Sequence, residues 1–243
     1  MQLIDSGASH TDWSMIAQAS GKEGQVAADA LERLVRRYWS AVYAYIRRTG
    51  RDVHEAADLT QGFVCDIIIS RRLCEYADPQ RGRFRTLLLG AVQNYLREQH
   101  RHDLRHRTLG TDMRPLPLEP SSSEFSTGET PEQAFCYHWS ATLVRQVLTD
   151  VRHECEKDGL DAHWKVFEHR VVRPMLLNEP PTDHATLVGQ LHLKDESQAA
   201  NMMITVKRRF ARALYQEIGR TVMDPSQIED ELHELLRDLE RTT

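Results

Sequence analysis

Apolar residues recur at spacings of three and four along most of this chain, and this periodicity restricts the chain to helices. Each such run places its apolar side chains on one helix face, where they can be buried together. In residues 25–49 that face comprises Leu31, Leu34, Val35, Tyr38, Val42, Tyr45 and Ile46. No segment alternates apolar and polar residues over a useful length, and the sequence contains no internal repeat. The sequence therefore predicts an all-α fold.

Helix caps and breakers set the limits of the expected helices. Gly50 can end the first long helix, Asp52 can cap the next one, and Pro131 suits a first helical position. The pattern predicts helices at 25–49, 54–71, 84–105, 131–157, 161–177, 184–191, 197–220 and 225–240, with a short helix or turn at 72–76.

The segment 108–130 differs in composition from the rest of the chain. It contains three prolines, a run of three serines and Gly128, which predicts a flexible linker rather than a packed element. We therefore expect two helical domains joined by this linker. The predicted parts are an N-terminal leader at 1–24, a helical domain at 25–107, the linker at 108–130, a second helical domain at 131–223 and an acidic C-terminal helix at 224–243.

Composition favours a cytoplasmic protein without a membrane anchor. The 243 residues are 40% apolar, yet no apolar run approaches the ~20 residues that a membrane span needs. Residues 1–24 lack the apolar core of a secretory signal. The four cysteines show no CxxC spacing, as is typical of reduced thiols in an intracellular protein.

The net charge of −5 conceals a strong asymmetry along the chain. Residues 81–107 carry seven arginines against two acidic residues, and residues 207–220 carry five basic residues against one acidic residue. Residues 224–240 carry seven acidic residues against one arginine. Local basic patches, rather than the total charge, determine nucleic-acid binding.

The stretch 81–107 has the residue types of a nucleic-acid surface. Asn94, Arg97, Arg101 and Arg105 share one helical face. Arginine binds phosphates and bases, asparagine and glutamine can read adenine edges, and an exposed Phe84 could stack on an unpaired base. A solvated basic face with this phenylalanine in the core is the alternative, and it is the better interpretation for any single arginine. The whole set favours nucleic-acid binding.

Residues 182–215 have the dimensions of a helix-turn-helix. A short apolar helix, a turn at 193–196 and a helix that begins at Ser197 follow in the required order. The usual turn glycine is missing, and any two-helix corner has a similar pattern.

The histidines and cysteines match no metal-ligand spacing. His100, His102 and His106 lie close together, with Cys65 and Cys74 elsewhere, but no zinc quartet results. The sequence also lacks a glycine-rich phosphate loop and a candidate nucleophile beside a base. We expect no catalytic residue, no metal, no cofactor and no enzymatic activity.

The acidic helix at 224–240 is amphipathic and allows three interpretations. It could be a simple solvated helix, a cover over the basic helix that precedes it, or a docking site for a regulator. We favour the solvated helix.

Six segments occur together and in a fixed order: Tyr38–Arg48, Ala57–Phe63, Asp78–Arg85, Asn94–Arg97, Arg208–Leu214 and Thr221–Pro225. They resemble RNA polymerase sigma factors of the sigma-70 family, extracytoplasmic function (ECF) group, and in particular the ECF-like sigma factors of planctomycete-type bacteria. The resemblance covers residues 25–107 with several linked motifs and residues 131–236 less closely.

The resemblance implies a subunit that binds core RNA polymerase and directs promoter recognition, DNA melting and transcription initiation. Residues Asp58, Leu59, Gln61 and Phe63 would bind the clamp helices of the polymerase β′ subunit. Among them, the aspartate and glutamine would supply polar pairing and the leucine apolar contact. The second domain would touch the β flap. An anti-sigma factor or another regulator is a further candidate partner.

The resemblance also assigns two groups of DNA-binding residues. The loop 78–85 and the helix after it would melt and read the minus-ten element, with one flipped base held by the loop. The residues assigned to the minus-ten element are Arg81, Arg83, Phe84, Arg85, Gln93, Asn94, Arg97 and Arg101. Those assigned to the minus-thirty-five element are Ser197, Gln198, Asn201, Lys207, Arg208, Arg209 and Arg212.

The second recognition helix departs from the family pattern. Ala200 stands where related chains carry lysine, and Asp195 and Glu196 precede the helix, where they would repel phosphate although they can also cap it. These departures predict weak or altered reading of the minus-thirty-five element. Two alternatives remain: a helical DNA-binding regulator that acts without polymerase, and a sigma-like interaction module without promoter activity. The Asp58–Phe63 segment distinguishes the first, because a simple repressor has no reason to expose it.

Overall fold

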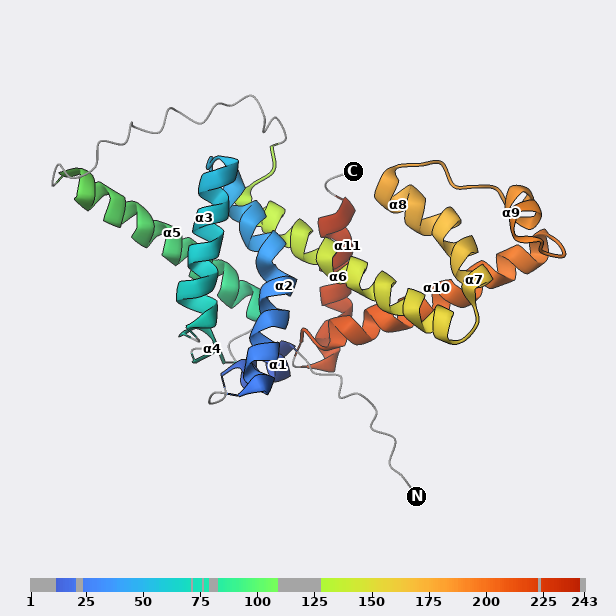
Figure 1. Ribbon diagram of the computed structural model, residues 1–243, viewed down its shortest axis with the longest axis horizontal. Coiled ribbons are helices and arrows are strands. Elements are labelled where there is room, and N and C mark those ends of the chain that lie inside the picture. The colour runs from blue at the N-terminus through green and yellow to red at the C-terminus, as the bar shows by residue number, and fades with distance from the viewer. Residues whose placement is uncertain are drawn as a thin grey trace, which may run out of the picture. The chain divides into compact units, whose positions relative to one another are not determined.

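The computed structural model describes residues 12–20, 24–70, 72–75, 77–78, 83–108, 128–222 and 224–240 (Figure 1). These segments contain helices and no strand, which confirms the all-α prediction. None of their helices is long and apolar enough to cross a membrane. The α-helices are α1 (Asp12–Ala19), α2 (Gln25–Arg48), α3 (Val53–Phe63), α4 (Arg72–Glu75), α5 (Phe84–Thr108), α6 (Pro131–Lys157), α7 (Asp161–Phe167), α8 (Arg173–Leu177), α9 (His184–Leu191), α10 (Glu196–Gly219) and α11 (Ile228–Glu240).

Within the described ranges, three further segments are π-helical or 3₁₀ rather than α-helical. The predicted helix at 54–71 is α3 continued by the π-helical segment η1 (Val64–Ile69), and η3 (Glu168–Val172) interrupts the predicted helix at 161–177 in the same way. The 3₁₀ segment η4 (Pro225–Gln227) precedes α11.

The chain divides into two compact units, which differ from the predicted domains. Unit 1 comprises the described residues up to Thr142 together with those from Ile218 onward, and unit 2 is Leu143–Glu217. Part of α6 and the whole of α11 therefore belong to unit 1, whereas the sequence suggested a boundary at residue 131 and a separate tail. Most of the predicted linker, residues 109–127, lies outside the described residues.

Side-chain contacts explain why the beginning of α6 belongs to unit 1. The Ser40 and Thr142 hydroxyls lie 2.9 Å apart, and Arg48 donates to Glu129 across 2.5 Å. Tyr45 also donates to Glu132 across 3.3 Å. These contacts fix α6 against α2 over about three turns.

Helix α2 supplies the centre of the unit 1 core. Leu34, Tyr38 and Ile46 are at most 1% exposed. The helix ends at Arg48, and Gly50 follows with a φ of 88°, in the left-handed region that glycine adopts most easily. Helix α1 buries Met15 and its neighbours in contact with α2, so described residues of the predicted leader form part of the core.

Helices α3 and α5 approach each other closely. Helix α3 begins at a side-chain cap, because Asp52 accepts the Glu55 backbone N–H at 2.8 Å.

The contact between α3 and α5 lies further along α3. A Cβ on Gly62 would lie 2.4 Å from the Tyr95 hydroxyl. The Phe63 and Tyr95 rings meet edge to face with centroids 5.5 Å apart. A side chain at position 62 would therefore force the Tyr95 hydroxyl to move.

In unit 2, the helices predicted at 184–191 and 197–220 are α9 and α10 (Figure 1). Asp183 caps α9 by accepting the Thr186 N–H at 2.7 Å. His192, with φ of 53°, takes the left-handed position where the sequence lacked a glycine. Leu187 and Ala199 pack with Val166 in a small core, each fully buried.

Candidate functional site

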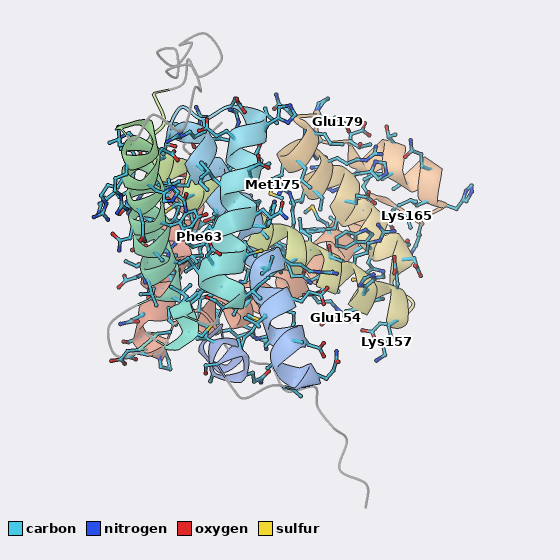
Figure 2. All side chains as sticks on the ribbon, turned by 60° about the vertical axis from the view of Figure 1, so that its left-hand side comes forward. Phe63, Glu154, Lys157, Lys165, Met175 and Glu179 are labelled. Carbon is cyan, nitrogen blue, oxygen red and sulfur yellow. The ribbon has the colours of Figure 1, made fainter. Side chains whose placement is uncertain are left out.

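The outer face of α3 carries the residues predicted to bind polymerase. Asp58 and Gln61 are exposed, and Leu59 is half-buried beside them. Phe63, labelled in Figure 2, is different: it is 0% exposed and its ring packs on that of Tyr95 inside unit 1. The prediction that Phe63 contacts a partner is therefore wrong. Its position on the apolar face of α3 makes it part of the core that orients the other three.

A cleft of about 460 Å³ follows this face, between η1 and α5. Its lining includes Cys65, Asp66, Glu98 and His102. Among the described residues no three His, Cys, Asp or Glu side chains are arranged to hold a metal ion. π-helical turns often occur at functional sites, and η1 lies beside this cleft.

The carboxyl-terminal half of α5 presents an exposed basic row. Arg97, Arg101 and Arg105 are exposed, as is Asn94. Arg97 donates to Asn94 Oδ1 at 3.0 Å, and the Nε atoms of Arg101 and Arg105 each donate to the carbonyl one turn earlier at 3.3 Å. These contacts align the side chains along the helix, and none of the three arginines forms an ion pair with a described carboxylate.

Gln93 belongs to the interior rather than to this row. It is half-buried, and its amide donates to Glu132 at 3.2 Å. The predicted role of Gln93 in base reading would require this contact to break.

The amino-terminal end of α5 does not present the surface that the sequence suggested. Phe84 is 2% exposed and meets the Tyr38 ring edge to face at 5.4 Å. The prediction that Phe84 stacks on an unpaired base is therefore wrong, and the core alternative is the observed one. Arg85 is 8% exposed, and Arg83 is half-buried. Arg81, also assigned to this group, lies outside the described residues.

Both described arginines form ion pairs with helix α11. Arg83 contacts Glu231 at 2.7 Å and also pairs with Glu234. Arg85 contacts the same two carboxylates at 3.0 and 2.5 Å. Its guanidinium carbon also lies 4.6 Å from the centre of the Trp139 ring, a cation–π arrangement.

The two carboxylates in this cluster respond differently to their surroundings. Burial raises the pKa of Glu231, and the nearby Arg85 and Arg83 charges oppose that rise without cancelling it. For Glu234, partial burial acts in the same direction, but the hydrogen bond and charge of Arg83, with Arg85, outweigh it and lower the pKa. The difference follows exposure, since the Glu231 side chain is 1% exposed and that of Glu234 is 42% exposed.

Helix α11 is therefore not the simple solvated helix that we favoured. Ile228, Glu231 and Leu235 are buried on one face. Its acidic residues also face the amino-terminal end of α5, where the helix dipole favours negative charge. Sequence analysis missed Glu231, Glu234 and Trp139 as site residues. The spacing of the two glutamates on the buried side of an amphipathic helix was the available signal.

The second predicted DNA surface lies on α10 in unit 2. Asp195 caps this helix by accepting the Gln198 N–H at 2.8 Å, and the Gln198 side chain accepts the Lys194 N–H at 2.7 Å. Arg209 donates to Asp158 across 2.6 Å. Gln198 and Arg209 thus already have partners within the unit. The exposed members of the predicted set are Ser197, Asn201, Lys207, Arg208 and Arg212.

Comparison with protein-family models, with curated proteins and with solved structures found no match to this chain.

Proposed function

We propose that this protein is an ECF-type sigma factor, which binds core RNA polymerase and directs promoter recognition, DNA melting and initiation. The observation that carries the proposal is the combination of two exposed faces in unit 1. Asp58 and Gln61 lie on α3, and the row that includes Arg101 lies on α5. Gly62 against Tyr95 holds these helices in close contact. A docking face and a basic face in one compact unit suit a protein that brings polymerase to DNA.

The basic row has the chemistry to bind an opened strand. Arg97 and Arg101 supply charge for phosphates, and Asn94 beside them supplies an amide for a base edge. Arginine guanidinium groups can also stack on the faces of unpaired bases through cation–π contacts. Binding of this kind favours the melted promoter over the duplex. The polymerase itself performs the chemistry.

Unit 2 would read the upstream promoter element through α10. Asn201 and Lys207 are exposed on this helix, and the turn before it is well capped. The exposed Asp195 and Glu196 oppose phosphate at the start of the helix. We therefore assign most of the DNA affinity to unit 1 and expect reading of the minus-thirty-five element to be weak or altered.

Core binding provides the direct test of the polymerase face. Replacing Asp58 and Gln61 with alanine in the full chain removes two exposed polar side chains and leaves the core intact, so binding should fall while folding is retained. Co-elution with core polymerase measures binding, and circular dichroism measures folding.

The matched control replaces Gln25 and Asp29, an exposed glutamine and aspartate of α2 in the same unit. We expect normal binding from this control. Equal binding by both double variants would refute the role of Asp58 and Gln61. Such a result would favour the alternative, a helical DNA-binding regulator that acts without polymerase.

A further inference from the structure

We propose that α11 is an internal competitor for DNA, which occupies Arg83 and Arg85 and closes this end of α5 to nucleic acid until α11 is displaced. This inference rests on the proposed function, because it takes α5 as the DNA-binding helix. It assigns a regulatory role to the acidic helix at the end of unit 1.

The contacts resemble those that the two arginines would make with a phosphate. Glu231 and Glu234 lie one helical turn apart and present carboxylate oxygens to both guanidinium groups. Arginine binds carboxylates and phosphates through the same planar arrangement of N–H donors. While both guanidinium groups are paired in this way, a DNA phosphate must compete with the two carboxylates for them.

The ion-pair cluster leaves buried polar atoms without hydrogen-bond partners, which is unfavourable for a contact whose only role is stability. Within the described part of the chain, Arg85 Nη1 and Glu231 Oε1 are buried without a hydrogen-bond partner. Burial also raises the pKa of Glu231, so its charged form is penalised. A buried ion pair with unsatisfied atoms contributes little net stability, because desolvation offsets the attraction. Another anion can therefore replace α11 at a modest cost.

Helix α11 has the properties of a separable element. It has 13 residues, and only Ile228 and Leu235 are buried apolar side chains. A helix of this length is marginal when it stands alone, so it depends on its contacts with unit 1. Displacement would expose a short amphipathic helix and free both arginines.

The test measures the affinity of the full chain for a fluorescent single-stranded DNA of mixed sequence. Glu231→Gln with Glu234→Gln removes the competing charge while keeping side-chain volume. We expect about tenfold tighter binding, a usual size for coupling between two sites. The salt dependence should also steepen by about 0.7 in log–log slope for each arginine that is freed.

The matched control is Glu229→Gln with Asp230→Asn, which changes the net charge equally on the exposed face of α11. It should leave affinity and slope close to those of the unsubstituted chain. Equal gains from both double variants would overturn the proposal, because the effect would then be a matter of net charge alone. No gain from either variant would also overturn it, because the two glutamates would then not compete with DNA.

Two further variants keep the test decisive. Adding Arg83→Ala to the Glu231→Gln, Glu234→Gln background should reduce the gain in DNA affinity. If the Glu231→Gln, Glu234→Gln protein fails to fold, the single variant Glu234→Gln replaces it. The Glu234 side chain is 42% exposed, so its substitution disturbs the core less. A folded Glu234→Gln protein without tighter binding would overturn the proposal.

This experiment contains no polymerase, so its outcome is separate from that of core binding. Tighter DNA binding without core association would support the role of α11 and refute the sigma factor. Core association without the gain would refute the role of α11 alone.

Discussion

The two ends of helix α5 carry the same residue type in opposite environments. At the amino-terminal end, Arg83 and Arg85 pair with α11 and are largely shielded. At the carboxyl-terminal end, Arg97, Arg101 and Arg105 are exposed. The sequence pattern treats all five as one basic surface. The structure instead divides them into one group that is occupied within the protein and one that is available to a ligand.

The largest expected difference between the groups is in stability. Arg85→Ala removes the partner of a buried carboxylate and the contact with Trp139, so we expect a loss of about 3 kcal/mol. Arg101→Ala removes an exposed side chain and should change stability by less than about 0.5 kcal/mol. Urea unfolding of both variants measures the difference. Equal losses would mean that the two ends of α5 do not differ in this way.

A second prediction concerns the middle of α5, between the two groups of arginines, where this helix packs against α3. Gly62→Ala forces a methyl group against the Tyr95 hydroxyl, so we expect a loss of about 1–3 kcal/mol. Gly90→Ala, with no described atom within 4 Å of the new methyl group, should stabilise α5 by up to about 1 kcal/mol. Thermal unfolding of the two variants should therefore shift in opposite directions. A stabilised Gly62→Ala protein would show that the approach of the helices is looser than described.

DNA binding should distinguish the two groups of arginines more finely. Arg97→Ala and Arg101→Ala should each lower the salt slope for single-stranded DNA by about 0.7, because each removes one phosphate contact. Lys207→Ala on α10 provides the comparison with unit 2. Titrations at several salt concentrations measure the slopes. Unchanged slopes in both α5 variants would exclude the exposed row as the DNA surface.

The smallest expected effect is in the pH dependence of stability. Glu234 has a lowered pKa, so its contribution is present above the unfolded pKa and is lost as the pH falls through the folded value. Glu231 has a raised pKa, so its ionisation costs stability as the pH rises above the unfolded pKa. On acidification from pH 7, the stability deficit of Glu234→Gln should shrink, and that of Glu231→Gln should grow. Denaturant titrations between pH 3 and 7 measure both deficits, and parallel trends would contradict this account.

Local patterns in the sequence predicted most of the helices. Caps such as Asp52 and Asp183 were identified because each residue acts on its own helix within three positions. The left-handed turn at His192 could not be predicted, because glycine is the usual residue there. The two helices on either side of this turn were predicted from their apolar spacing instead.

The candidate site could be predicted only in part. Asp58 and Gln61 were expected on an exposed face and are found there. The partners of Arg85 lie 146 and 149 positions further along the chain, and no local rule joins residues so far apart. The prediction of an exposed Phe84 was wrong for another reason. Phe84 is the first residue of its helix, and the sequence does not reveal which face of the helix meets the core there.

The central claim is that this protein is a promoter-recognition subunit, and run-off transcription tests it most directly. Core polymerase of the same organism is supplied with genomic promoter fragments, with and without the full chain. Our account predicts discrete transcripts only when the protein is present, and their loss when Arg97 and Arg101 are replaced while core binding is retained. A protein that neither associates with core polymerase nor directs specific initiation would contradict it.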